Sequence, residues 1–167
     1  TIDAIEHLFS TGQLRLRWAG MTSFWGYLAG FAAVAIVCRR NALPLAKFGD
    51  PTAAPLGLAL AFARVGCFLG GCDYGKVTSL PWGVRFPSGS SAWRDHVDSG
   101  WLSAPRAESL PVHPTQVYEA LVGLALLGIV LAARRWRTGP GQVFAVFVVG
   151  YAAARFPLEW LRADPDR

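Results

Sequence analysis

Residues 51–70 read PTAAPLGLALAFARVGCFLG, an apolar run that carries one charged side chain, Arg64. A run of about 20 apolar residues is long enough to cross the hydrocarbon core of a bilayer as a helix. An arginine at that depth is costly unless it faces a partner, a water-filled cavity or an anionic ligand. The run therefore predicts a transmembrane helix, and it marks Arg64 as a candidate functional residue.

The composition of the whole chain extends this interpretation. Its 167 residues are 53% hydrophobic and only 16% charged, which is too apolar for an average soluble domain. Further apolar runs cover about residues 22–38, 116–133 and 142–161. We therefore expect an all-α integral membrane protein, a single membrane domain over 1–167. It would have about four transmembrane helices and a long external loop or lid at 71–115. A soluble helical bundle is the alternative.

The basic residues gather in two short connectors between the predicted spans. These are Arg39, Arg40 and Lys47 in the first, and Arg134, Arg135 and Arg137 in the second. Four alternating spans put both connectors on one side, which the positive-inside rule makes cytoplasmic. The external loop then lies on the opposite side. A basic stripe with interleaved aromatic residues is absent from the sequence, so nucleic acid is not an expected partner.

Counting along the predicted spans places several charges at one level. Asp50 followed by Pro51 is typical of a helix start, and Arg64 lies about 13 residues, or ~20 Å, beyond it. Arg155 lies at the same ~20 Å depth in the span that begins near residue 142. Glu119 lies near the outer end of the third span. We therefore expect these charges to meet in the outer half of the membrane.

The fourth span presents further polar residues on the face that carries Arg155. Tyr151, Arg155, Glu159 and Arg162 follow one another at helical spacing. Two interpretations stay open for this layer of charge. It is either a set of ion pairs that joins helices, or a binding site for an additional anion. Phosphate is the natural candidate, because the arginine guanidinium matches its oxygens bidentately.

Three segments taken together resemble the phosphatidylglycerol–prolipoprotein diacylglyceryl transferase family. They are RVGCFLGGCDYG (64–75), HPTQVYEA (113–120) and YAAARFPLEWLR (151–162), and GMTSFWGY (20–27) is similar to a fourth family segment. The resemblance implies a membrane-embedded transferase of the bacterial inner membrane whose active face is directed toward the periplasm. Such an enzyme moves a diacylglyceryl group from phosphatidylglycerol to the lipobox cysteine thiol of a prelipoprotein.

The resemblance also implies roles for individual residues. Arg64 and Arg155 take the places of the phosphate-binding arginines, with Glu159 as the carboxylate that follows the second. His113 joins them as a catalytic candidate. A thiol needs a base to become a good nucleophile, and Glu159, Glu119 and His113 are the candidates for that base, with Glu159 favoured. The implied substrate-binding residues are Gly26, Gly66, Gly75, Gln116, Tyr118, Glu119 and Tyr151. The implied partners are phosphatidylglycerol, the lipobox segment of a prelipoprotein and the bilayer itself.

The chain departs from the family pattern at several positions. Trp25 stands where well-studied members have a histidine, and a first and a last span are not found, so we expect a fragment of a longer chain or a trimmed member. A catalytically silent relative that binds anionic phospholipid or a lipoprotein precursor is therefore an alternative, and a small transporter subunit is another. Cys67 and Cys72 lie near each other in sequence, so a disulfide between them remains an open possibility. The spacing of Cys72 and Asp73 from His96 or His113 matches no standard zinc motif, and we expect neither a metal ion nor a cofactor.

Overall fold

The computed structural model describes residues 21–102 and 108–163. The helices in these residues are α2 (Met21–Arg40), α3 (Leu45–Gly70), α4 (Ser91–Asp98), α5 (Thr115–Ala133) and α6 (Gln142–Leu161). Apart from isolated β-bridges, the described residues form no strand. The chain divides into two compact units, residues 1–44 and 45–167.

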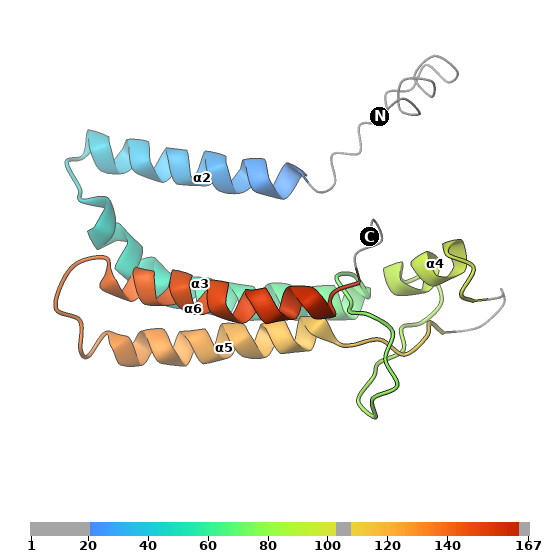
Figure 1. Cartoon of the computed structure of the whole chain (residues 1–167). Helices are drawn as coiled ribbons and strands as arrows, with labels where there is room; N and C mark the ends of the chain where they lie inside the picture. Colours follow the sequence, from blue (N-terminus) through green and yellow to red (C-terminus); the bar gives the residue numbers. More distant parts are fainter. Residues whose placement is uncertain (1–20, 103–107, 164–167) are drawn as a thin grey trace, which may run out of the picture. The chain divides into compact units, whose positions relative to one another are not determined.

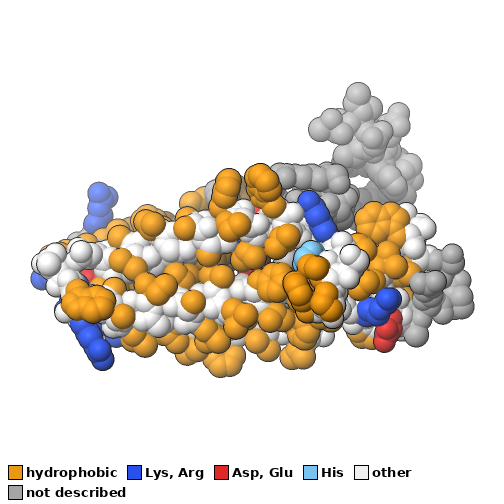
Figure 2. Space-filling view, turned by 60° about the horizontal axis from the view of Figure 1, so that its bottom comes forward, with side chains coloured by type: hydrophobic (Ala, Val, Ile, Leu, Met, Phe, Trp, Pro, Cys, Tyr) orange, Lys and Arg blue, Asp and Glu red, His pale blue; other side chains and the backbone are white. Residues whose placement is uncertain are grey.

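In the second unit, α3, α5 and α6 pack side by side, as Figure 1 shows. All three are long and apolar enough to cross a membrane. Large apolar side chains such as Phe62, Leu121 and Phe156 remain exposed on them, and Figure 2 shows hydrophobic side chains along the length of the visible face. A soluble bundle would bury such residues, so the expectation of an all-α membrane protein is confirmed.

The four predicted spans correspond to helices. The predicted bounds 116–133 and 142–161 agree with α5 and α6 to within one residue. In the first unit, α2 contains the predicted segment 22–38 and ends at the basic pair Arg39 and Arg40. That α2 crosses the membrane, and that 1–167 is one domain, remain predictions.

The predicted start of the second span at Asp50-Pro51 is wrong. Helix α3 begins at Leu45 and runs through both prolines, Pro51 and Pro55. The buried Asp50 carboxylate accepts hydrogen bonds from the backbone N–H groups of Gly141 (2.9 Å) and Phe144 (3.0 Å). Asp50 therefore satisfies two of the unpaired donors at the start of α6. Its carboxylate caps α6 and not the helix that contains it.

This contact explains why the depth count still works. Because Asp50 on α3 meets Gly141 and Phe144 on α6, the two helices are level at these residues. An equal number of turns from there brings Arg64 and Arg155 to one height. The additional residues at the start of α3 lie before the level point, so they do not change the register.

Helices α3 and α5 approach each other closely at two glycines. A Cβ on Gly123 would lie 2.8 Å from the carbonyl oxygen of Gly57 and 2.9 Å from the backbone nitrogen of Ala61. Small residues allow this approach between helices in lipid. The two glycines therefore bring the backbones of α3 and α5 together below the level of Arg64.

We expect Gly123→Leu to separate these helices and to lower the free energy of unfolding by about 3 kcal/mol, since overpacking forces backbone shifts. Unfolding of purified protein in mixed micelles, titrated with sodium dodecyl sulfate, measures the change. Gly128→Leu on the same helix is the matched control, because a Cβ there meets nothing within 4 Å. Equal stability of both variants would contradict the close contact.

The segment predicted as an external loop or lid, 71–115, contains the short helix α4 at one end of the bundle (Figure 1), and its last residue, Thr115, begins α5. Ser90 caps α4 by accepting a hydrogen bond from the backbone N–H of Trp93 (3.2 Å). A small core of Tyr74, Phe86, Ala92 and Val112 holds the segment together. Helix α4 therefore packs, through Ala92, against a small hydrophobic core.

Hydrogen bonds hold two polar rings, His96 and Tyr74, in this external segment. His96 Nδ1 accepts a hydrogen bond from the backbone N–H of Leu110 (3.2 Å), and burial lowers the pKa of the His96 imidazole, although Asp95 opposes this. The Tyr74 hydroxyl donates to Asp95 (2.8 Å), and burial with this hydrogen bond raises the pKa of Tyr74. Both rings are therefore uncharged at neutral pH.

Candidate active site

Six charged side chains form one continuous chain of alternating sign where the bundle meets the external segment. In order they are Glu159, Arg155, Glu119, Arg64, Asp73 and Arg162. Glu119 lies at the centre: Oε1 is 3.0 Å from Nη1 of Arg155, and Oε2 is 2.7 Å from Nε of Arg64. The predicted meeting of Arg64, Arg155, Glu119 and Glu159 is therefore found.

The outer members extend this chain in both directions. Arg155 Nη2 lies 2.6 Å from Oε2 of Glu159, one turn along α6. Arg64 Nη1 lies 2.8 Å from Oδ2 of Asp73, and Oδ1 of Asp73 lies 3.0 Å from Nη2 of Arg162. Each arginine on α3 and in the middle of α6 thus has two carboxylate partners. Three positive and three negative charges leave the cluster neutral.

Burial differs strongly along the chain. The Glu119 side chain is 2% exposed, whereas Asp73 is 36% and Glu159 is 42% exposed. Glu119 is therefore the enclosed carboxylate of the chain, whereas Glu159 is exposed. A buried charge requires close partners, and Glu119 meets this requirement with an arginine on each side.

Asp73 is a site residue that sequence reasoning missed. The backbone follows α3 with left-handed conformations at Gly71 (φ 67°) and Asp73 (φ 55°), which aspartate tolerates better than most residues. Burial raises the pKa of the Asp73 carboxyl, but attraction to Arg162 and Arg64 outweighs it, so the pKa lies below its usual value. Arg162, noted in the sequence only for its helix face, is its second partner.

The HPTQVYEA segment holds the turn that carries Asp73. Gln116 Nε2 donates to the carbonyl oxygen of Cys72 (2.6 Å), and Thr115 Oγ1 donates to that of Asp73 (2.8 Å). Both side chains are fully buried. Gln116 thus fixes the backbone beside the arginines through its amide nitrogen. Its role in substrate binding stays a prediction.

His113 and Tyr118 form a separate group. His113 Nδ1 lies 3.5 Å from the Tyr118 hydroxyl, which accepts a hydrogen bond from Trp82 Nε1 (2.9 Å). Among the described residues, the ring of His113 contacts Tyr118 and makes no ion pair with the six-charge chain. The structure thus brings together the predicted arginines and carboxylates but leaves His113 beside them.

The remaining predicted residues fall into distinct places. A Cβ on Gly75 would lie 2.7 Å from both His113 Cβ and the Leu161 carbonyl oxygen, so only glycine fits there. A Cβ on Gly66 would meet nothing within 4 Å. Tyr151 stacks on Phe147, with ring centroids 6.3 Å apart. Gly26 belongs to α2 with Trp25, in the first unit.

The cysteines are free thiols. Cys72 Sγ lies 3.6 Å from the carbonyl oxygen of Cys67, and Cys67 Sγ lies 3.5 Å from Asp73 Oδ2. The three ligand atoms of Cys67, Cys72 and Asp73 lie within 4.8 Å of one another. Both Asp73 oxygens already contact arginines, and these positive charges disfavour a cation there.

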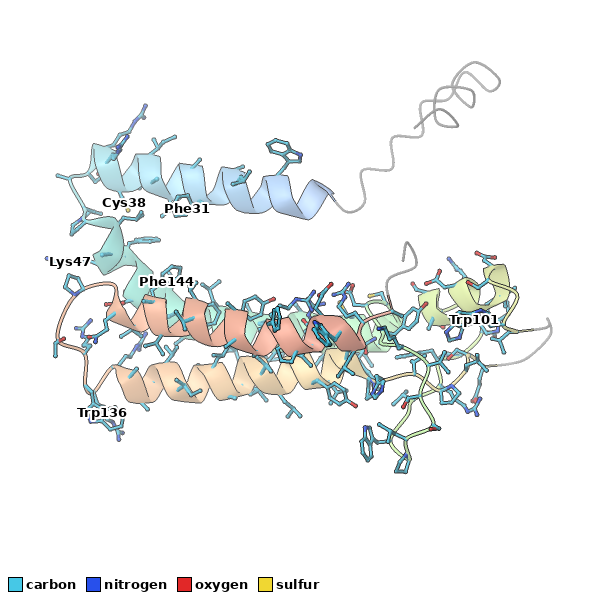
Figure 3. The ribbon with its side chains drawn as sticks, in the orientation of Figure 1. Phe31, Cys38, Lys47, Trp101, Trp136 and Phe144 are labelled. Atoms are coloured by element: carbon cyan, nitrogen blue, oxygen red, sulfur yellow. The ribbon has the colours of Figure 1, made fainter. Side chains whose placement is uncertain are left out.

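A cavity of about 730 Å³ opens beside the six-charge chain. Arg162, Glu159 and Trp160 line it from the end of α6, and Asp95 and His96 line it from α4. Trp101, also in its wall, lies at the same end of the bundle as α4, far from Trp136 and Lys47 (Figure 3). The cavity thus gives outside access to Glu159 and Arg162, the two ends of the charge chain.

These features define a helical membrane protein with an arginine–carboxylate cluster at one end of its bundle, open to a lined cavity. The sequence model of the family described as prolipoprotein diacylglyceryl transferase matches residues 5–167. The chain therefore belongs to the prolipoprotein diacylglyceryl transferase family.

Bacterial relatives named phosphatidylglycerol–prolipoprotein diacylglyceryl transferase support this membership. The chain is 39% identical to one from Rhizobium meliloti over 155 residues, covering 89% of this chain and 48% of the relative. It is 37% identical to one from Nocardia farcinica, covering 88% of this chain and 30% of the relative. A relative from Rhodococcus jostii is 36% identical, with 88% and 42% covered. The chain therefore spans less than half the length of these relatives.

Proposed function

We propose that this protein transfers a diacylglyceryl group from phosphatidylglycerol to the lipobox cysteine thiol of a prelipoprotein. The observation that carries the proposal is the pair of deep arginines, Arg64 and Arg155, joined by one buried carboxylate of Glu119. The names of the relatives support the same substrates. The cluster and its cavity would face the outer side of the bacterial inner membrane, opposite the basic connectors.

In this reaction the acceptor sulfur forms a bond to the glycerol carbon that carries the phosphate. The carbon–oxygen bond breaks, and glycerol phosphate leaves with the electron pair. Negative charge grows on the leaving phosphate, and the positive charges of Arg64 and Arg155 stabilise it in a site of low dielectric constant. The arginines would therefore act mainly on the transition state.

The acceptor thiol must lose a proton to become a strong nucleophile. Glu159 is the carboxylate placed for this, because it lines the cavity and lies beside Arg155. We propose that the Glu159 carboxylate accepts the proton of the acceptor thiol. His113, paired with Tyr118, would orient the segment before α5 instead.

A direct assay tests the proposal. Purified protein in vesicles that contain phosphatidylglycerol, mixed with a lipobox peptide, should give peptide heavier by one diacylglyceryl group in mass spectrometry. Vesicles of phosphatidylcholine alone should give none. A Cys→Ser peptide is the matched control, because it lacks the acceptor thiol.

The second candidate is the catalytically silent relative, and Trp25 is the observation that favours it. If the wild-type protein binds phosphatidylglycerol but transfers nothing, the proposed activity is wrong and the silent relative is favoured. Trp25→His would then be expected to create transfer. The transporter alternative has less support, since α3, α5 and α6 are each continuous helices rather than broken ones.

A further inference from the structure

We propose that Asp73 is a built-in substitute for the substrate phosphate: it holds Arg64 and Arg162 in the free protein, and the headgroup phosphate of an anionic lipid displaces it. This inference rests on the proposed function and adds a seat for the phosphate, the Arg64–Arg162 fork. In this arrangement Arg64 contacts the phosphate directly, whereas Arg155 stays paired with Glu119 and acts on the phosphate through its charge.

The contacts of Asp73 are those that a phosphate would make. Its two oxygens bind two different arginines, Oδ2 to Arg64 at 2.8 Å and Oδ1 to Arg162 at 3.0 Å. The two non-bridging oxygens of a phosphodiester can take the same two positions, because guanidinium groups bind carboxylate and phosphate with similar geometry.

The burial of the two carboxylates decides which of them an incoming phosphate can displace from the arginines. Glu119, between Arg64 and Arg155, is 2% exposed, and a displaced carboxylate there would remain buried without a partner, at a large cost in free energy. Asp73 is 36% exposed, so its carboxylate can turn into water when it leaves the arginines. Arg155 therefore keeps Glu119, and the fork at Asp73 is the place where an anion enters.

The route to this fork is also present. Arg162 lines the 730 Å³ cavity at the end of α6 and also binds Asp73, so one residue joins the cavity to the fork. The wall also carries Lys76, Asp95 and Glu159, so its charges balance, and Arg162 is the wall residue that belongs to the fork. An anion that enters the cavity thus reaches Arg162 before it meets the buried Glu119.

Asp73 competes as a full negative charge. Burial raises the pKa of its carboxyl, but Arg162 and Arg64 lower it further, and the net pKa lies below its ordinary value. Asp73 is thus ionised at neutral pH. Removal of its charge should therefore strengthen anion binding, whereas removal of a purely structural residue should weaken it.

The test compares Asp73→Asn with the wild-type protein. Calorimetry measures the affinity of detergent-purified protein for glycerol phosphate, and native mass spectrometry measures binding of phosphatidylglycerol in nanodiscs of phosphatidylcholine. We expect Asp73→Asn to bind both about tenfold more tightly, as for the loss of about 1.4 kcal/mol of competition. Asp95→Asn is the matched control: it removes a charge from the same cavity wall but contacts Tyr74, not an arginine.

Unchanged or weaker binding by Asp73→Asn would overturn the inference, as would equal tightening by Asp95→Asn. Tightening for glycerol phosphate alone would overturn the assignment to a lipid headgroup. If Asp73→Asn does not fold, Asp73→Ser serves the same comparison. A wild-type protein that transfers diacylglyceryl while Asp73→Asn shows no gain overturns this inference alone, whereas one that neither binds nor transfers overturns the proposed function too.

Discussion

Arg64→Ala should reduce diacylglyceryl transfer by a factor of at least about 100, because electrostatic stabilisation of a developing oxyanion typically contributes this much or more. Arg64 belongs to both candidate phosphate-binding pairs, Arg64 with Arg155 and Arg64 with Arg162. Glu119 and Asp73 link it to these two arginines. Its loss removes positive charge from the centre of the six-charge chain. The rate of lipobox peptide modification at saturating phosphatidylglycerol measures the effect.

The same variant should still fold and insert. Glu119 keeps Arg155 as a partner, and Asp73 keeps Arg162, so neither carboxylate is left alone. Arg135→Ala is the control, since this exposed arginine lies at the other end of α5. Transfer at a near-normal rate by a well-inserted Arg64→Ala protein would refute the phosphate-binding role of the arginines.

The course of the helices and the level of their charges were predictable from the sequence. Apolar length alone gave the bounds of α5 and α6, because a bilayer requires about 20 apolar residues. The rise per residue of a helix placed Arg64, Arg155 and Glu119 at one level. A charged side chain in lipid has a high free energy unless it has a partner, so these three were expected to meet.

Two features depend on contacts that the sequence does not display. Asp50 carries a strong local signal for a helix start, yet tertiary contact with Gly141 and Phe144 uses its carboxylate for α6. Asp73 enters the site only because the chain turns through a left-handed conformation after α3. That turn is fixed by Gln116 and Thr115, more than 40 positions away.

Glu119→Gln should be the most destabilising single change in the site. Glu119 is the buried link between Arg64 on α3 and Arg155 on α6, and it comes from the first part of α5, so one side chain joins all three helices. Glutamine keeps the shape but removes the charge. Arg64 and Arg155, both largely enclosed, would then lose a common partner and repel each other.

We expect Glu119→Gln to lower the free energy of unfolding by about 3 kcal/mol, near the lower end for a broken buried ion pair. The lower end applies because Asp73 still holds Arg64 and Glu159 still holds Arg155. Unfolding with sodium dodecyl sulfate measures the change, and Glu159→Gln, which removes an exposed carboxylate from the same arginine, should cost less than about 1 kcal/mol. If the two variants lose equal stability, the burial of Glu119 does not explain its contribution to the free energy of unfolding. In the double variant Glu119→Gln with Arg155→Met, the repulsion between the arginines is gone, so it should recover part of the loss.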